Sequence, residues 1–253
     1  MDGSFLSQPK VVAAARQFVC VRLTTYENAA EAAFLRSICP TGSGELENTV
    51  FTILSPDGNR QLARASRSAR VVFGDADPMA DTMNRVAKWY RPRSTATQAL
   101  ADLPFVANVR LAINVAACDN QPLIVLAGKN AATRGKLAEK LKPLAWSDEF
   151  RGRFVYAEAF NEKDLSAIAD AKGDAGVLAV QPDRFGLTGT ILARLPETSS
   201  VETLARGLGD SLSKHQPQKE SFRTHVCDGK EAGAFWETVV SVTDPMERHA
   251  RQR

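Results

Sequence analysis

Cysteine is scarce in this 253-residue sequence, and the scarcity excludes two classes of protein. Small secreted scaffolds hold their cysteines at high density, and structural zinc sites use closely spaced pairs of ligands. The sequence has neither pattern, because its four cysteines lie far apart, at Cys20, Cys39, Cys118 and Cys227. We therefore expect thiols that are mostly structural.

Long apolar runs and a strong net charge are also missing. No run approaches the ~20 apolar residues of a membrane-spanning helix, and the N-terminus lacks the basic and apolar regions of a secretory signal. A net charge of +3 is too small to indicate binding to nucleic acid or to a membrane surface by itself. Together with 44% hydrophobic and 24% charged residues, these absences predict a soluble, cytoplasmic protein with a buried core.

Motifs for cofactors and for common catalytic sites are absent as well. The sequence contains no Gly-rich phosphate loop, no Ser/His/Asp motif and no carboxylate pair in an interpretable context. We therefore predict no cofactor and no catalytic residue in this chain.

The first half of the chain alternates predicted helices and strands. Helices are predicted from apolar residues at helical spacing, and strands from runs rich in β-branched residues. The turn Pro56-Asp57-Gly58 favours a hairpin, because proline presets one corner and glycine accepts a positive φ at the other. The predicted elements are helix 10–16, strand 18–23, helix 28–38, strand 50–54, strand 61–64 and helix 78–90.

The second half repeats this order after a predicted linker over residues 91–97. The run 122–127 is short and apolar throughout, which is typical of a buried parallel strand. The predicted elements are helix 106–118, strand 122–127, helix 131–144, strand 154–157, helix 163–169, strands 177–180 and 190–194, and helix 200–213, with Ser199 or Ser200 as its N-cap. Strands that alternate with helices indicate an α/β fold with a partly parallel sheet.

Two short stretches of the first half carry a resemblance to a known family. Residues 5–11 have the form Phe-x-x-x-Pro-x-Val and run into strand 18–23, and strand 50–54 runs into a Pro-Asp-Gly turn. Both stretches resemble the thioredoxin superfamily, and the second half resembles it by element order. The resemblance implies two tandem βαβαββα units, the first without its N-terminal strand and active-site turn. We place the domains at 1–92 and 98–216, followed by a C-terminal extension over 217–253.

The resemblance also implies where redox chemistry would occur. The family carries a Cys-x-x-Cys pair where a helix begins; in the first half that place would precede Met1, and in the second half it falls on residues 128–133, which contain no cysteine. A cis-proline precedes the family's third strand, whereas this chain has Thr49 and Gly176 there, so we expect trans peptide bonds. We therefore expect a non-catalytic binding or scaffold protein with a protein or peptide partner, and leave homodimerisation open.

Two alternatives remain open at this stage. A thiol–disulfide oxidoreductase would follow if the Cys-x-x-Cys pair lay upstream of this start, with a location outside the cytoplasm if a signal preceded it. A redox sensor would follow if Cys39, at a helix end before Pro40, were a reactive thiol. By contrast, we expect Cys20 to be buried in strand 18–23 and Cys118 to be structural.

Three other groups of residues are candidates for function or packing. His225, Cys227 and Asp228 are metal-ligand types, and on a strand the first two would share a side, but no second ligand cluster accompanies them and a loop is expected. A basic run that could meet an anionic partner, or form a solvated edge, consists of Arg60, Arg64, Arg67 and Arg70. Aromatic residues expected to pack in a core or where the two halves meet are Trp89, Tyr90, Phe235 and Trp236.

Overall fold

The chain packs as two compact units in a computed structural model. Unit 1 comprises Met1–Ala96 together with Trp236–Arg253, and unit 2 comprises Thr97–Phe235. The boundary at 96/97 lies at the end of the predicted linker, and the predicted extension over 217–253 is divided between the two units. The structure describes residues 5–21, 23–40, 46, 50–90, 100–171, 173, 175–235 and 238–240.

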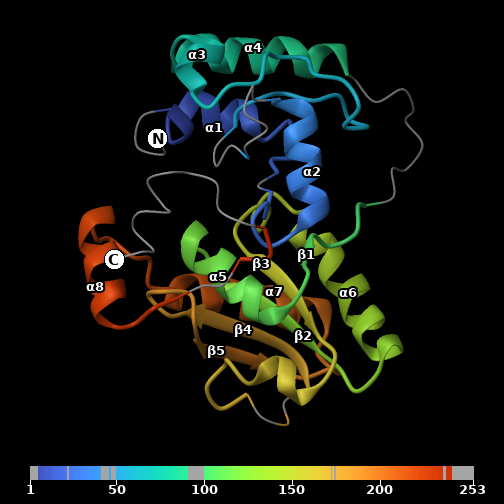
Figure 1. The fold of residues 1–253 in the computed structure, drawn as a ribbon. Helices are drawn as coiled ribbons and strands as arrows, with labels where there is room; N and C mark the ends of the chain where they lie inside the picture. Colours follow the sequence, from blue (N-terminus) through green and yellow to red (C-terminus); the bar gives the residue numbers. More distant parts are fainter. Residues whose placement is uncertain are drawn as a thin grey trace. The chain divides into compact units, whose positions relative to one another are not determined.

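Unit 2 is built around a mixed five-stranded sheet with the order β1-β3-β2-β4-β5 (Figure 1). β1, β3 and β2 are mutually parallel neighbours, whereas β4 is antiparallel to β2 and β5 is antiparallel to β4. The strands are β1 (Phe105–Val106), β2 (Leu123–Ala127), β3 (Val155–Ala159), β4 (Gly176–Pro182) and β5 (Gly189–Leu195). The α/β class predicted from the sequence is confirmed.

Helices cover both faces of this sheet. They are α5 (Val109–Asp119) and the 3-10 helix η2 (Glu162–Leu165) on one face, and α6 (Ala131–Ala145) and α7 (Val201–Lys214) on the other. The last helix of unit 2, α8 (Phe222–Glu231), contributes no described side chain to either core. The fully buried strand β2 divides its residues between two cores, because successive side chains point to opposite faces. Leu123 and Val125 pack with α5 and η2, whereas Ile124 and Leu126 pack with α6 and α7.

Side-chain caps start the main helices of unit 2. Asn108, Asn130 and Ser200 each accept a hydrogen bond from the backbone N–H three residues later, at the starts of α5, α6 and α7. Such caps satisfy one of the free N–H groups of the first turn. The element order predicted for 106–213 is confirmed, including the cap at Ser200, with two differences: helix 163–169 is the shorter η2, and β1 precedes α5.

Unit 1 has the predicted helices. They are α1 (Pro9–Ala15), α2 (Ala29–Ile38) and α4 (Ala76–Trp89), with the additional short helix α3 (Ala69–Phe73). α1, α3 and α4 share one core, in which the buried side chains include those of Phe5, Val11, Ile53, Met79 and Val86, whereas Ala32 and Leu35 of α2 pack in a separate cluster with Leu46.

The strands predicted for unit 1 are wrong in the part of it that the structure describes. Two isolated bridges, Phe51–Ser66 and Leu54–Gln61, stand where strands 50–54 and 61–64 are predicted, although the turn between them forms and Gly58 has φ +74°. The described residues of 18–23 form no strand, because Val19 and Val21 are 80% and 73% exposed and gain nothing from burial. The described residues of unit 1 therefore lack the βαβαββα order.

Candidate functional site

The start of α6 is the position at which the resemblance places redox chemistry. It follows the central strand β2 directly, and its residues are Gly128, the exposed Lys129 and the N-cap Asn130. The Asn130 side chain accepts hydrogen bonds from the Thr133 N–H at 2.9 Å and from the Thr133 hydroxyl at 3.1 Å. An amide therefore caps this helix, and no sulfur lies in its first turn.

A buried arginine supports this end of the sheet. The Arg134 side chain is only 10% exposed, and its Nη1 donates to the Gly128 carbonyl at 3.1 Å. Its Nε lies 3.7 Å from Oε1 of Glu158 on β3. At this distance the two side chains form an ion pair but no hydrogen bond. Gly128 must be small, because a Cβ there would lie 2.9 Å from Arg134 Cγ.

The Arg134 guanidinium also fixes an exposed aromatic ring. Its central carbon lies 4.6 Å from the centroid of the Phe160 ring, within the range of a cation–π contact. Phe160 follows β3 and is 56% exposed, and its N–H donates to Asp164 Oδ2 at 2.7 Å. We call Lys129, Asn130, Arg134 and Phe160 the edge surface. It joins an exposed ring and an exposed cation to a helix N-terminus, which favours negative charge nearby.

Gly176 is the residue of unit 2 at which the resemblance places the family's cis-proline. It is the buried first residue of β4 and has φ +121°, where an added Cβ would lie 2.2 Å from the Leu195 carbonyl oxygen. The described residues contain no cis peptide bond. Thr49, the corresponding residue of the first half, lies outside the described residues.

The four cysteines lie at separate places, and no disulfide joins them. Cys20 is exposed, so its predicted burial in a strand is wrong for the reason given for Val19 and Val21. Cys118 is also exposed, near the end of α5, and Cys227 is exposed on α8. Cys39 is half-buried at the C-cap of α2.

All four arginines of the basic run of unit 1 are exposed. Arg60, Arg64 and Arg67 lie between the turn at Gly58 and α3, and Arg70 lies in the first turn of α3. Arg60 Nη2 donates to the Tyr90 hydroxyl at 2.5 Å. This contact ties Arg60 to the end of α4.

Two of the aromatic residues expected to pack between the halves are largely exposed. Trp89 is 71% exposed and Phe235 is 64% exposed, whereas Tyr90 is half-buried. Trp236 lies outside the described residues.

His225, Cys227 and Asp228 lie on the helix α8, and not in the expected loop or on a strand. Helical spacing places His225 and Asp228 on one side and turns Cys227 away from them. The described part of the chain contains no group of three or more side chains that could hold a metal ion. The pair takes part instead in a charged network with the β4–β5 turn.

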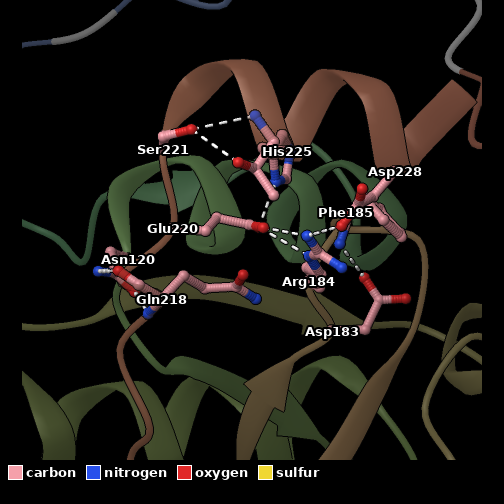
Figure 2. A network of polar contacts seen from close by, with 10 residues as sticks. Asn120, Asp183, Arg184, Phe185, Gln218, Glu220, Ser221, His225 and Asp228 are labelled. Carbon is pink, nitrogen blue, oxygen red and sulfur yellow. Dashed lines mark hydrogen bonds and ion pairs between the residues drawn. The ribbon is translucent and has the colours of Figure 1, made fainter.

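Figure 2 shows this network around the Arg184 side chain, which lies between Glu220 and Asp228. Arg184 Nε donates to Glu220 Oε1 at 2.7 Å, and Nη2 donates to the second oxygen of Glu220 and to Asp228 Oδ2, the latter at 2.5 Å. His225 Nδ1 lies 2.8 Å from Glu220 Oε1. Hydrogen bonds from Arg184 first, and then from His225, lower the pKa of Glu220 to about 2.

Sequence reasoning did not find this network or Phe160. It selected His225 and Asp228 as metal-ligand types but not Arg184 or Glu220, because Arg184 is separated from Glu220 by 36 positions and from Asp228 by 44. The sequence does contain one sign of Phe160: it is a large apolar residue in a polar stretch directly after a predicted strand.

No protein-family model matches the chain, and no curated protein or solved structure is significantly similar to it. None of the helices in the described residues is long and apolar enough to cross a membrane.

Proposed function

We propose that unit 2 is a thioredoxin-like module that binds a peptide or protein partner at the edge surface and performs no thiol–disulfide exchange. The observation that carries this proposal is the start of α6, where the resemblance places a Cys-x-x-Cys pair and the chain has Gly-Lys-Asn-Ala-Ala-Thr. The element order from β2 to α7 supports it, because it reads βαβαββα with η2 as the second helix.

Dithiol exchange needs an attacking thiolate and a second thiol beside it. Unit 2 has two cysteines, and neither lies at the start of α6. Cys118 lies near the end of α5, just before β2 begins, whereas α6 starts just after β2 ends. At a rise of about 3.3 Å per residue, β2 separates these two ends of the sheet by roughly 13 Å. Cys227 lies on α8, which is attached at the β4–β5 turn.

The edge surface has features that favour binding. Phe160 exposes an aromatic ring that Arg134 holds in place, so a partner would immobilise few rotatable bonds by packing on it. The exposed Lys129 and the α6 N-terminus beside it favour negative charge. We therefore propose a partner segment with an apolar side chain next to a carboxylate.

Reduction of insulin disulfides with dithiothreitol tests the absence of exchange. We expect the full chain to precipitate insulin no faster than dithiothreitol alone. The double variant Lys129→Cys/Ala132→Cys places a Cys-x-x-Cys pair at the start of α6 and should accelerate the reaction, with Lys129→Cys alone as its control. Robust catalysis by the natural chain would refute the proposal.

Selection from a random-peptide display library tests the binding half of the proposal. Fluorescence anisotropy of a selected peptide should show at least about fivefold weaker binding to Phe160→Ala, since truncation of a central aromatic residue commonly costs more than ~1 kcal/mol. Phe235→Ala is the matched control, because Phe235 is a similarly exposed aromatic residue of unit 2. Equal affinities of the two variants would contradict the edge surface as the binding site.

A further inference from the structure

We propose that α8 is a releasable helix, held on unit 2 by charge pairs to one arginine of the β4–β5 turn. We call Arg184, Glu220, His225 and Asp228 the latch (Figure 2). The proposal concerns the end of the sheet away from α6, and it does not depend on the proposed binding function.

One guanidinium group holds α8 at two points. Glu220 directly precedes the N-cap residue Ser221, whereas Asp228 lies in the second half of the helix. Arg184 donates to both carboxylates, and His225 contacts the same Glu220 oxygen that receives the Arg184 Nε hydrogen bond. Loss of the Arg184 charge would therefore remove the attachment at both points.

Among the α8 residues whose side chains the structure describes, apolar burial contributes little to the attachment of the helix. Val226 is 36% exposed, and among the α8 residues whose side chains the structure describes none with an apolar side chain is buried. The neighbouring turn residue Phe185 makes an apolar contact with α8, because its ring centroid lies 5.3 Å from that of His225. By contrast, α7 buries Leu204 and Leu208 completely in the core.

The turn that receives α8 is rigid, so release would move the helix and not the turn. The Asp183 carboxylate accepts hydrogen bonds from the N–H groups of Phe185, Leu187 and Thr188. On the other side of the turn, Arg110 Nη1 on α5 donates to the Gly186 carbonyl at 2.6 Å.

Salt and charge removal should control the release. The latch side chains are between 19% and 40% exposed, and ion pairs at that exposure weaken as ionic strength rises. A ten-residue helix does not persist alone in water, so detached α8 would unfold. Its ten residues would then span up to ~33 Å in place of about 15 Å.

Hydrogen–deuterium exchange of the full chain, read by mass spectrometry, tests the proposal. In the natural chain at low salt, peptides that cover α8 should be protected, and 0.5 M sodium chloride should accelerate their exchange at least tenfold. Arg184→Gln should produce the same acceleration at low salt, and Asp228→Asn a smaller one. Peptides from β2 and α7 should exchange at unchanged rates throughout, which separates release of α8 from unfolding of unit 2.

Arg223→Gln is the matched control, because it removes one positive charge from the exposed side of α8, outside the latch. It should leave the α8 exchange rate within twofold of the natural chain. The proposal is overturned if salt and Arg184→Gln leave α8 exchange unchanged, if β2 and α7 accelerate together with α8, or if Arg223→Gln releases α8 as fully as Arg184→Gln does.

Discussion

The two ends of the unit 2 sheet differ in how their charged and aromatic groups are used. At the α6 end, the Phe160 ring and Lys129 are exposed to solvent. At the β4–β5 end, Arg184 is paired with two carboxylates, and the Phe185 ring packs against His225. The denser polar network therefore pairs its charged groups within unit 2, whereas the α6 end leaves an aromatic ring and a lysine exposed, as the proposed binding function requires.

Both ends require a glycine, and substitution of these glycines should have the largest effects on stability. Gly176→Ala should lower the free energy of unfolding by about 3–5 kcal/mol, because its Cβ would lie 2.2 Å from the Leu195 carbonyl oxygen at φ +121°. Gly186→Ala should cost about 1–3 kcal/mol, because its Cβ would lie 2.8 Å from Asn114 Cα at φ +66°. Urea denaturation of the full chain measures both.

Gly135→Ala is the control for these two variants. Gly135 lies inside α6 with open space around its Cβ position, so alanine should add about 0.5–1 kcal/mol of stability. A Gly186→Ala variant less stable than Gly176→Ala would show that the β4–β5 end, and not the α6 end, has the tighter packing.

The second prediction concerns the buried arginine of the α6 end. Arg134→Met keeps most of the chain length but leaves the Gly128 carbonyl without its side-chain donor and Glu158 without its positive partner. We expect a loss of about 1–3 kcal/mol in the free energy of unfolding, together with weaker peptide binding, because Phe160 loses its cation–π support. Lys136→Met, on an exposed position of α6, should change neither quantity. Unchanged peptide affinity of Arg134→Met would mean that Phe160 binds without a fixed ring.

Local sequence patterns predicted much of unit 2 and little of its polar chemistry. The strand β2 and the helix cap at Ser200 are each predicted from a few neighbouring residues, and both are confirmed. Strand 18–23 of unit 1 has the same β-branched composition but no sheet to cover it, so composition alone misled the prediction. The latch joins positions 184, 220 and 228, and the contact of Arg134 with Phe160 joins α6 to the end of β3. Only the packed fold brings such residues together.

The third prediction uses pH to release α8 from the β4–β5 turn. The pKa of Glu220 is lowered to about 2 by Arg184 and His225, the two charged or titratable side chains that contact it. Its folded-state pKa is therefore below the unfolded value, so its contribution is fully present above about pH 4.5 and is lost as the pH falls toward 2. Exchange of the α8 amides, corrected for the intrinsic pH dependence of exchange, should rise over this window. Glu220→Gln should show this faster exchange already at pH 6, and a natural chain with constant α8 protection between pH 6 and pH 3 would contradict the prediction.

The smallest expected effect is on peptide affinity. It comes from substituting one exposed lysine at each end of the unit 2 sheet, Lys129 at the start of α6 and Lys230 on α8. Lys129→Gln should weaken a selected acidic peptide about two- to threefold at low salt, because an exposed charge contributes less than ~1 kcal/mol, and the difference should vanish at 0.5 M sodium chloride. Lys230→Gln removes an exposed charge from α8 and should leave the affinity unchanged. Neither variant should alter the urea midpoint, because both side chains are exposed. If Lys230→Gln weakened peptide binding as much as Lys129→Gln did, the affinity would depend on the net charge of unit 2. This result would contradict the edge surface as the binding site.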